Sequence, residues 1–568
     1  MPKRGVYSII FIVVITGLMG GIFVYNNHSL HEKDPWYHTI DQDMFISVEA
    51  MALNSGLSPK HSVHPGVGTK LLYSYFLSLM KKMGITPVSA ITDLEESSDP
   101  LTYWPWIIGS GRTFSLVAAI MLCTIIGGIA WQLTGSMLFF PLGFFMGTVS
   151  YGTMYQSLII RTELVAVISG SLAFLFMLLS LRAQKISNYV TFLILSGIFS
   201  GLAIYTKIQA YPFLAIIIFW FLFIEKGRFE EYTMREDSCS CVTAPSTFRK
   251  GLLRGFLQIN YCYLFRIFPA IILTLISSFV LLFCTRYTPY YIPALSILAL
   301  FGPLCVLRPG NKKLFWLYAK LENFINFLSG LIFSLIVPLI FLIPKIGIST
   351  SLTYWEKTLW VVYHPWIIYK AVKCSTSLTA GLQGAGAFIM PYVNLQYWLV
   401  ALLVYFLVFC RGERKENCIL FILITISYAA VNALRSYHAA HYIIYTDIFI
   451  ICAMMLAFRG IQNHLIRTLK LNRIFVTIGI FSVCVILTAF SGVAQFDKLE
   501  AKYRVRLGLG PDMSKRIYEW DGWYVKRYDK AMESAYKDLQ GFQERSNRFL
   551  QKDENNFVRY NVGVHLER

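Results

Sequence analysis

The apolar run VYSIIFIVVITGLMGGIFVY, from Val6 to Tyr25, decides the fold. A helix of this length crosses a hydrocarbon core of roughly 30 Å. Lys3 and Arg4 precede the run, and no clear small-residue cleavage signal follows it. We therefore predict a retained membrane helix whose basic end faces the cytoplasm, so that the segment after it lies outside.

The rest of the chain has the composition of an integral membrane protein. Of its 568 residues, 56% are hydrophobic and 15% are charged, and the mean hydropathy is +0.54. Such a chain is too apolar for a water-soluble globule. We predict an all-α polytopic membrane protein with about thirteen transmembrane helices. After the first helix, the predicted spans are 107–130, 136–157, 163–181, 189–206, 209–224, 267–285, 288–306, 325–345, 396–410, 417–434, 442–458 and 473–491.

The positions of the basic residues agree with this topology. If the spans alternate in direction, five of the loops assigned to the cytoplasm carry Lys or Arg, as the positive-inside rule favours. These loops are 182–185, 226–266, 308–313, 411–415 and 459–473. The formal net charge of +19 is therefore largely a topology signal, and it does not indicate a nucleic-acid partner.

The predicted topology divides the chain into four parts. They are a membrane module over 1–345 with its first outer loop at 26–106, a large outer loop at 346–395, C-terminal membrane helices over 396–491, and an extracytoplasmic tail over 492–568. The sequence contains no Gly-rich phosphate loop, no nucleophile elbow and no His-Glu-x-x-His motif. Only Cys374 of the eleven cysteines falls clearly in an outer loop, so no disulfide scaffold is predicted.

Polar residues at the ends of the predicted spans fall on the outer face. The loop after the first helix carries Asp41 and Asp43, and His64-Pro65 follows. Others on this face are Arg112, Arg161, Glu163, Lys207, Arg435, His438, His441 and Tyr442. A single ionisable residue at a span end usually just meets water or a headgroup. Many on one face indicate a pocket that takes an anionic, phosphate-bearing lipid and places a base beside it.

This ordered set resembles the GT-C superfamily of membrane glycosyltransferases, particularly the branch of protein O-mannosyltransferases and the lipid A aminoarabinose transferase. The elements that carry the resemblance are Asp41-Gln42-Asp43-Met44-Phe45, His64-Pro65-Gly66, Gly111-Arg112, Arg161-Thr162-Glu163, Gly201 to Lys207, and His441-Tyr442. The likeness covers residues 1–210 best and 430–460 less well. Gln42 departs from the branch, which often has Glu there. Asp41 aligns with the catalytic Asp, and Asp43 is the candidate replacement for the missing Glu.

The resemblance implies a glycosyltransferase that moves a monosaccharide from a polyprenyl-phosphate donor to a lipid, glycan or protein hydroxyl. Transfer would occur outside the cytoplasm, with inversion at the anomeric carbon. The implied roles are Asp41 or Asp43 as general base, Lys207, Arg112, Arg435 and His64 at the donor phosphate, and Glu163, Arg161, His441 and Tyr442 in orienting the acceptor or a cation. The family implies no catalytic metal, and a divalent cation at the two Asp residues is the alternative.

The sequence leaves several alternatives open. A polymerase or ligase that uses a diphosphate-linked oligosaccharide is one, although the early Asp-x-Asp loop favours the first function. A transporter is another, but it predicts ionisable residues at mid-membrane. His64-Pro65 equally suits the start of an amphipathic surface helix. The resemblance favours a bacterial cytoplasmic membrane, with the endoplasmic reticulum as the alternative.

Overall fold

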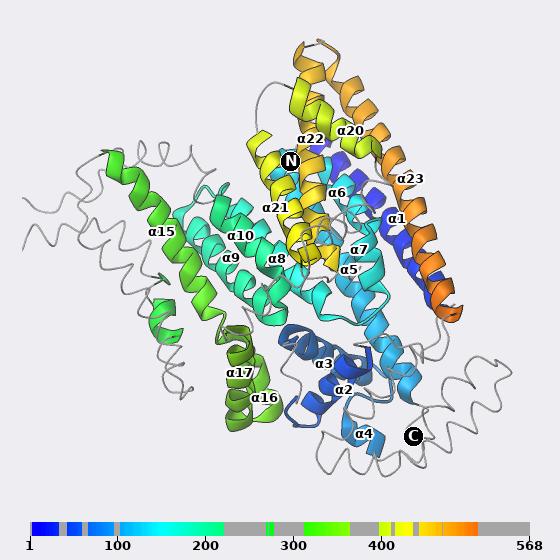
Figure 1. The fold of residues 1–568 in the computed structure, drawn as a ribbon, viewed down its shortest axis with the longest axis vertical. Coiled ribbons are helices and arrows are strands. Elements are labelled where there is room, and N and C mark those ends of the chain that lie inside the picture. Colours follow the sequence, from blue (N-terminus) through cyan, green and yellow to red (C-terminus); the bar gives the residue numbers. More distant parts are fainter. Residues whose placement is uncertain are drawn as a thin grey trace, which may run out of the picture. The chain divides into compact units, whose positions relative to one another are not determined.

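The structure is a computed structural model whose described part is helical (Figure 1). It describes residues 3–32, 43–59, 66–95, 103–220, 269–270, 272–277, 312–363, 397–410, 415–434, 442–468 and 470–508. These residues contain α-helices and one short 3-10 helix, and no strand occurs among them. The predicted all-α class is confirmed for this part of the chain.

The helices follow one another with short connections in the first part of the chain. They are α1 (Lys3–Glu32), α2 (Asp43–Asn54), α3 (Val67–Lys82), α4 (Ile91–Glu95), α5 (Trp104–Thr134), α6 (Phe139–Thr148), α7 (Tyr151–Ser157), α8 (Thr162–Ser180), α9 (Ile186–Thr206), η2 (Ile208–Ala210) and α10 (Tyr211–Phe219). Later helices are α15 (Lys312–Phe333), α16 (Val337–Ile346), α17 (Ile348–Tyr363), α20 (Tyr397–Phe409), α21 (Lys415–Leu434), α22 (Ile444–Thr468) and α23 (Arg473–Gly508).

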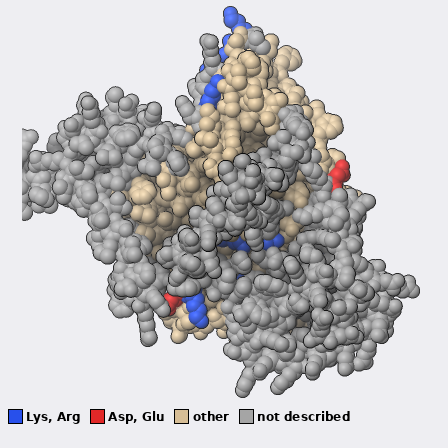
Figure 2. All heavy atoms as spheres, viewed as in Figure 1, with Lys and Arg blue, Asp and Glu red and all other residues tan. Residues whose placement is uncertain are grey.

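Six helical stretches of the described residues are long and apolar enough to cross a membrane. They are Pro105–Thr134, Thr162–Ser180, Ser187–Thr206, Asn323–Ile346, Ile444–Thr468 and Phe475–Asp497. On the face seen in Figure 2, most of the described surface is free of charged side chains. The protein is therefore a helical membrane protein, while the predicted count of about thirteen spans is not confirmed. The predicted span 288–306 lies outside the described residues, and of the predicted span 267–285 only 269–270 and 272–277 are described.

The predicted span 136–157 is two short helices. α6 ends at Thr148 and α7 begins at Tyr151. Between them Ser150 is extended, with φ −70° and ψ 137°, and its Oγ accepts a hydrogen bond from the Thr153 backbone N–H at 3.3 Å. An extended residue that caps the next helix ends the preceding one. Hydropathy alone does not detect this break because both helices are apolar.

Two other elements differ in extent from the predicted boundaries. The segment predicted as a large outer loop at 346–395 begins with a helix, α17. The last helix, α23, continues past the predicted end of the span at residue 491 and reaches Gly508.

The helices of the first loop pack on the beginning of α5. Their shared apolar core includes Ile46, Met51, Tyr73, Leu77, Val88, Ile91, Ile107 and Ile108. The Tyr73 hydroxyl donates a 2.7 Å hydrogen bond to the Ile107 carbonyl. α2, α3 and α4 are therefore fixed to the entrance of a membrane-spanning helix.

α3 is the helix predicted after His64-Pro65, and its outward face is apolar. Leu72 is 51% exposed and Leu79 is 52% exposed, whereas Lys70 and Ser74 are fully buried. The buried residues of α3 also include Leu71, Tyr73 and Leu77, so its inner face mixes polar and apolar side chains. The exposed leucines suit an apolar surrounding, and Lys70 and Ser74 bring polar groups to the interior of the protein.

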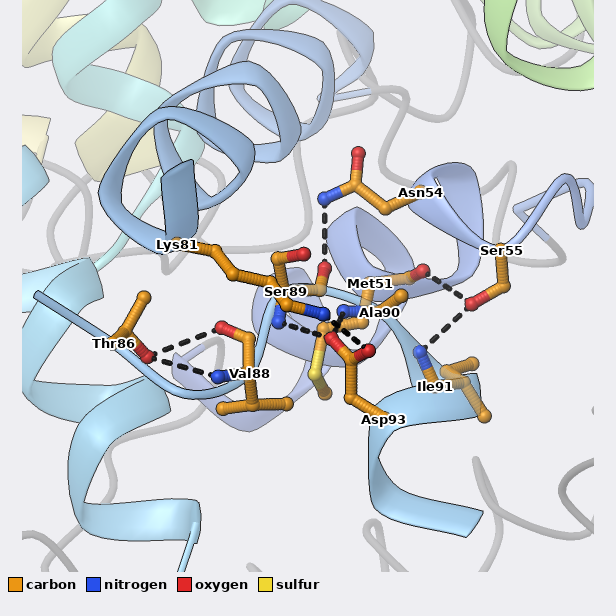
Figure 3. Close-up of polar contacts among 10 residues, drawn as sticks. All are labelled: Met51, Asn54, Ser55, Lys81, Thr86, Val88, Ser89, Ala90, Ile91 and Asp93. Atoms are coloured by element: carbon orange, nitrogen blue, oxygen red, sulfur yellow. Dashed lines mark hydrogen bonds and ion pairs between the residues drawn. The ribbon is translucent and has the colours of Figure 1, made fainter. Parts of the chain in front are cut away.

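A set of polar contacts closes the turn between α3 and α4 (Figure 3). The Asp93 carboxylate accepts hydrogen bonds from the backbone N–H groups of Ser89 at 2.7 Å and Ala90 at 2.9 Å, and it forms a 2.5 Å ion pair with Lys81. Asn54, at the end of α2, donates to the Ser89 carbonyl at 2.7 Å. Burial alone would raise the pKa of Asp93, but the hydrogen bonds from Lys81, Ser89 and Ala90 hold it below its ordinary value.

We expect this turn to loosen in acid. Because the folded pKa of Asp93 is depressed, its stabilising contribution is present above the ordinary pKa of 3.8 and is lost as the pH falls through the folded value. Asp93→Asn should accelerate hydrogen exchange of the Ser89 and Ala90 amides at neutral pH. Asp497→Asn, at an exposed position on α23, is the control. Unchanged exchange in Asp93→Asn would contradict the assignment.

The chain forms two compact units, 1–168 with 205–208 and 341–568, and 169–204 with 209–340. In the second unit α9 and α15 cross at close range. A Cβ at Gly197 would lie 2.0 Å from the Phe327 carbonyl oxygen, and one at Gly330 would lie 2.0 Å from the Ile194 carbonyl oxygen. Such backbone approach between membrane helices requires small residues.

Candidate functional site

A buried ion pair joins α2 and α3, two of the helices in the predicted first outer loop. Glu49 of α2 and Lys70 of α3 form it through Oε2 and Nζ, and both residues are fully buried. Burial lowers the pKa of Lys70, the Glu49 carboxylate opposes that effect, and the positive charge of Lys207 lowers the pKa further. A pair taken fully out of water is stable only if both partners stay in place.

A second group of charges surrounds Glu163 in the first turn of α8. Its Oε1 lies 3.2 Å from Lys207 Nζ, and its Oε2 accepts a 3.3 Å hydrogen bond from Arg161 Nε. Glu163 is fully buried, and the two cations are 4% exposed or less. Carboxylates are favoured at helix N-termini and cations at C-termini, and Lys207 directly follows the end of α9. The helix ends therefore help to hold this group.

The two groups adjoin each other within the first compact unit. The charge of Lys207 acts on Lys70, and the Gly66 backbone N–H donates a 3.0 Å hydrogen bond to the Thr206 carbonyl. The start of α3 thus lies against the end of α9. We call Glu49, Lys70, Arg161, Glu163 and Lys207 together the buried charge cluster.

Gly68 allows this close approach. A Cβ on Gly68 would lie 2.4 Å from Thr206 Oγ1, well inside contact distance. Gly68 is two residues before Lys70, and Thr206 is one residue before Lys207. The distance between the two lysines therefore depends on a glycine.

Gly68→Ala should reduce the free energy of unfolding by about 2 kcal/mol, because the new methyl group overlaps the Thr206 side chain. Adding Thr206→Ala to the same chain should recover most of the lost free energy of unfolding, because it removes the hydroxyl and methyl groups that the new methyl group overlaps. Thermal unfolding of the purified protein in detergent measures both. Gly109→Ala is the control, since nothing lies within 4 Å of a Cβ at that position. An unaltered melting temperature in Gly68→Ala would refute the packing argument.

Aromatic residues lie near both carboxylates of the cluster, Glu49 and Glu163. Tyr354 of α17 is close enough to Glu49 for the negative charge to act on its hydroxyl, and burial together with that charge raises the pKa of Tyr354 well above its ordinary value. The Trp355 ring packs edge-on against Tyr205, with centroids 5.5 Å apart. At the other end, Tyr445 of α22 lies within electrostatic range of Glu163 and Arg161.

The predicted site residues fall into two sets. Arg161, Glu163 and Lys207 are brought together by the contacts given above. Arg112 is 6% exposed on α5, and Tyr442 is 4% exposed with its ring 6.2 Å from that of Tyr445. Asp43 begins α2, but its side chain is outside the described residues, as are Asp41, His64, Arg435, His438 and His441. Their predicted roles stay predictions.

Glu49 and Lys70 were not predicted as site residues. Each was visible as a charge in an otherwise apolar or small-residue stretch, Ile46-Ser47-Val48-Glu49-Ala50 and Gly66-Val67-Gly68-Thr69-Lys70. Charged residues in such surroundings are buried only when paired. The two lie about twenty positions apart, and no sequence motif indicates that they meet.

No family model matches the chain, and no curated protein and no solved structure matches it either. The described residues contain no group of three or more His, Cys, Asp or Glu side chains that could hold a metal ion. The charged side chains of the site are therefore the evidence for its chemistry.

The buried charge cluster gathers three cations among the described residues. Lys70, Arg161 and Lys207 lie with the carboxylates of Glu49 and Glu163, and Arg112 is a further buried cation on α5. Buried Lys and Arg are costly unless anions accompany them. Cations gathered in this way are suited to bind an anion such as a phosphate.

The Glu49–Lys70 pair should show strong energetic coupling. Glu49→Gln alone should reduce stability by about 3 kcal/mol, because it leaves the Lys70 charge without its carboxylate. Combining Glu49→Leu with Lys70→Met should be much less damaging than either change alone. A double-mutant cycle on melting temperatures tests this. Glu356→Gln, at a half-buried position on α17, is the control. Simple additivity of the two changes would contradict the pairing.

Proposed function

We propose that this protein is a glycosyltransferase of the GT-C type, which transfers a monosaccharide from a polyprenyl-phosphate donor to an acceptor hydroxyl. The observation that carries the proposal is the buried charge cluster, in which Lys70, Arg161 and Lys207 lie with two carboxylates at the base of the first-loop helices. The proposed ligand of these cations is the phosphate of the donor lipid.

The phosphate is the group that changes most in charge during the reaction. As the bond between the anomeric carbon and the phosphate oxygen breaks, its electron pair stays on the phosphate, which becomes more negative. Fixed cations beside it stabilise the transition state more than the ground state. In this proposal Lys207 and Arg112 have that task, with Arg435 and His64 as further candidates. Lys70 is a further cation of the buried charge cluster.

The acceptor hydroxyl needs a base because it is a poor nucleophile until its proton is removed. Asp41 is the proposed base, and Asp43 is the second candidate. The acceptor oxygen forms its bond to the anomeric carbon while its proton passes to the carboxylate. One direct displacement of this kind inverts the anomeric configuration. Glu163 would hold Lys207 and Arg161 in place, and His441 and Tyr442 would orient the acceptor.

The proposed reaction takes place on the extracytoplasmic side of a bacterial cytoplasmic membrane. Glycolipid, polysaccharide and protein hydroxyls all suit an outward-facing base, and pocket shape selects the sugar. A catalytic metal is not required by this mechanism, and a divalent cation at Asp41 and Asp43 stays an alternative.

Transfer assays with purified protein and radiolabelled polyprenyl-phosphate sugars test the proposal. Loss of a general base typically lowers the rate by a factor of about 10² to 10⁴, so we expect Asp41→Asn to fall in this range. Lys207→Ala should lower kcat by about 10² through lost phosphate stabilisation. Lys185→Ala is the matched control, because Lys185 is exposed and lies between α8 and α9 at their opposite ends.

The outcomes separate the parts of the proposal. If Asp41→Asn transfers sugar at the wild-type rate and Asp43→Asn does not, the base is Asp43. If both variants stay active, neither carboxylate is the base. If the wild-type protein consumes no polyprenyl-phosphate donor with any acceptor, the glycosyltransferase proposal fails. Consumption of a diphosphate-linked oligosaccharide instead would favour the polymerase or ligase.

A further inference from the structure

A small enclosed space lies apart from the buried charge cluster, between α7, α22 and α23. Its volume is about 20 Å³, and its polar lining residues are Ser150, Asp447, Thr488, Ser491 and Gln495. A space of this size admits one particle the size of a water molecule. All five residues are at most 8% exposed.

The carboxylate in this lining is on a membrane-spanning helix. Asp447 lies in the first turn of α22, is 2% exposed, and accepts a 3.0 Å hydrogen bond from the Gly152 backbone N–H through Oδ2. Ionisable residues within membrane spans are costly and usually mark an ion or proton site. The helix N-terminus favours its ionised form.

Two neighbouring side chains have polar atoms with no hydrogen-bond partner. Thr488 Oγ1 and Gln495 Oε1 are both buried and unpartnered, and each residue is 2% exposed. Other helical threonines, such as Thr134 and Thr425, donate to the carbonyl four residues earlier. Thr488 does not make this bond, so its oxygen is available to a ligand in the space.

The lining brings several oxygen atoms to one small space. The carboxylate of Asp447 and the carbonyl oxygen of Gln495 only accept. The Ser150 hydroxyl already donates to Thr153 Oγ1 at 2.9 Å, so it offers a lone pair to the space. A cation can bind these oxygens and that of Thr488 at once. Hard cations prefer carboxylate, hydroxyl and amide oxygens, and Asp447 is the one carboxylate among the described lining residues, which suits a monovalent cation.

We infer that Asp447, Thr488, Gln495 and Ser150 bind a single monovalent cation of the size of Na⁺. The ion joins the first turn of α22 to the cap of α7 and to α23. Tyr445, which lies beside Glu163, is in that same turn. The cation therefore stabilises the position of α22 where this helix adjoins the buried charge cluster.

Salt exchange on the full-length protein in detergent tests the inference. NaCl should raise the melting temperature by on the order of 2 °C over choline chloride at equal ionic strength. Radiolabelled Na⁺ should bind saturably to the wild type. Asp447→Asn should abolish that binding, and Thr488→Val, which keeps the side-chain shape, should weaken it by about tenfold.

Thr425→Val on α21 is the matched control, because Thr425 is a buried helical threonine outside this lining. It should leave Na⁺ binding unchanged. Equal melting temperatures in NaCl and choline chloride, together with no saturable binding, would overturn the inference in favour of a bound water. A loss of binding in Thr425→Val as large as that in Thr488→Val would overturn it as well.

Discussion

Charges removed from water must be paired, and this constraint governs the arrangement of the first-loop helices. Glu49 and Lys70 lie on different helices, and Glu163 and Lys207 belong to the start of α8 and the end of α9. An isolated buried charge costs several kcal/mol, so each helix is held to the position of its partner. Displacing any one of them would leave at least one charge without its partner in the ion pair.

Backbone contacts hold together the same helices that the ion pairs join. Gly68 lets the start of α3 approach Thr206, and the Gly66 N–H bonds to the Thr206 carbonyl. At the end of α2, Asn54 donates to the Ser74 carbonyl of α3 at 3.0 Å and accepts a hydrogen bond from Lys345 of α16. The charges thus rest on helices that are themselves hydrogen-bonded to one another, and a site needs such rigid support to bind a ligand in one geometry.

The membrane setting explains how α3 can expose leucines while it buries polar groups. Leu72 and Leu79 are exposed, whereas Lys70 and Ser74 are buried together with apolar residues such as Tyr73. An apolar surrounding removes the hydrophobic penalty on the exposed leucines. Lys70 can then belong to the buried charge cluster while Tyr73 keeps α3 in the apolar core.

The sequence by itself determined the class of the protein and several parts of the site. Long apolar runs specify membrane helices, because a span must satisfy its own backbone hydrogen bonds in lipid. The sequence predicted Arg161, Glu163 and Lys207 on one face of the membrane, since alternate loops between spans lie on the same side. The roles of Asp41, His64, Arg435 and His441 remain predictions of the sequence, because these residues lie outside the described part.

Only the tertiary structure decided which charges meet. Glu49 and Lys70 carry no motif, and their pairing arises because α2 and α3 pack on α5 through an apolar core shared with Tyr73. The break at Ser150 was hidden within an apolar run for a similar reason, since hydropathy does not report a local hydrogen bond. Asp447, Thr488 and Gln495 come from two helices, and packing alone brings their oxygens to one space. The hydropathy pattern of a segment predicts whether it lies in lipid, in water or in the protein interior. The partners of a buried polar group depend instead on segments that are distant in the sequence.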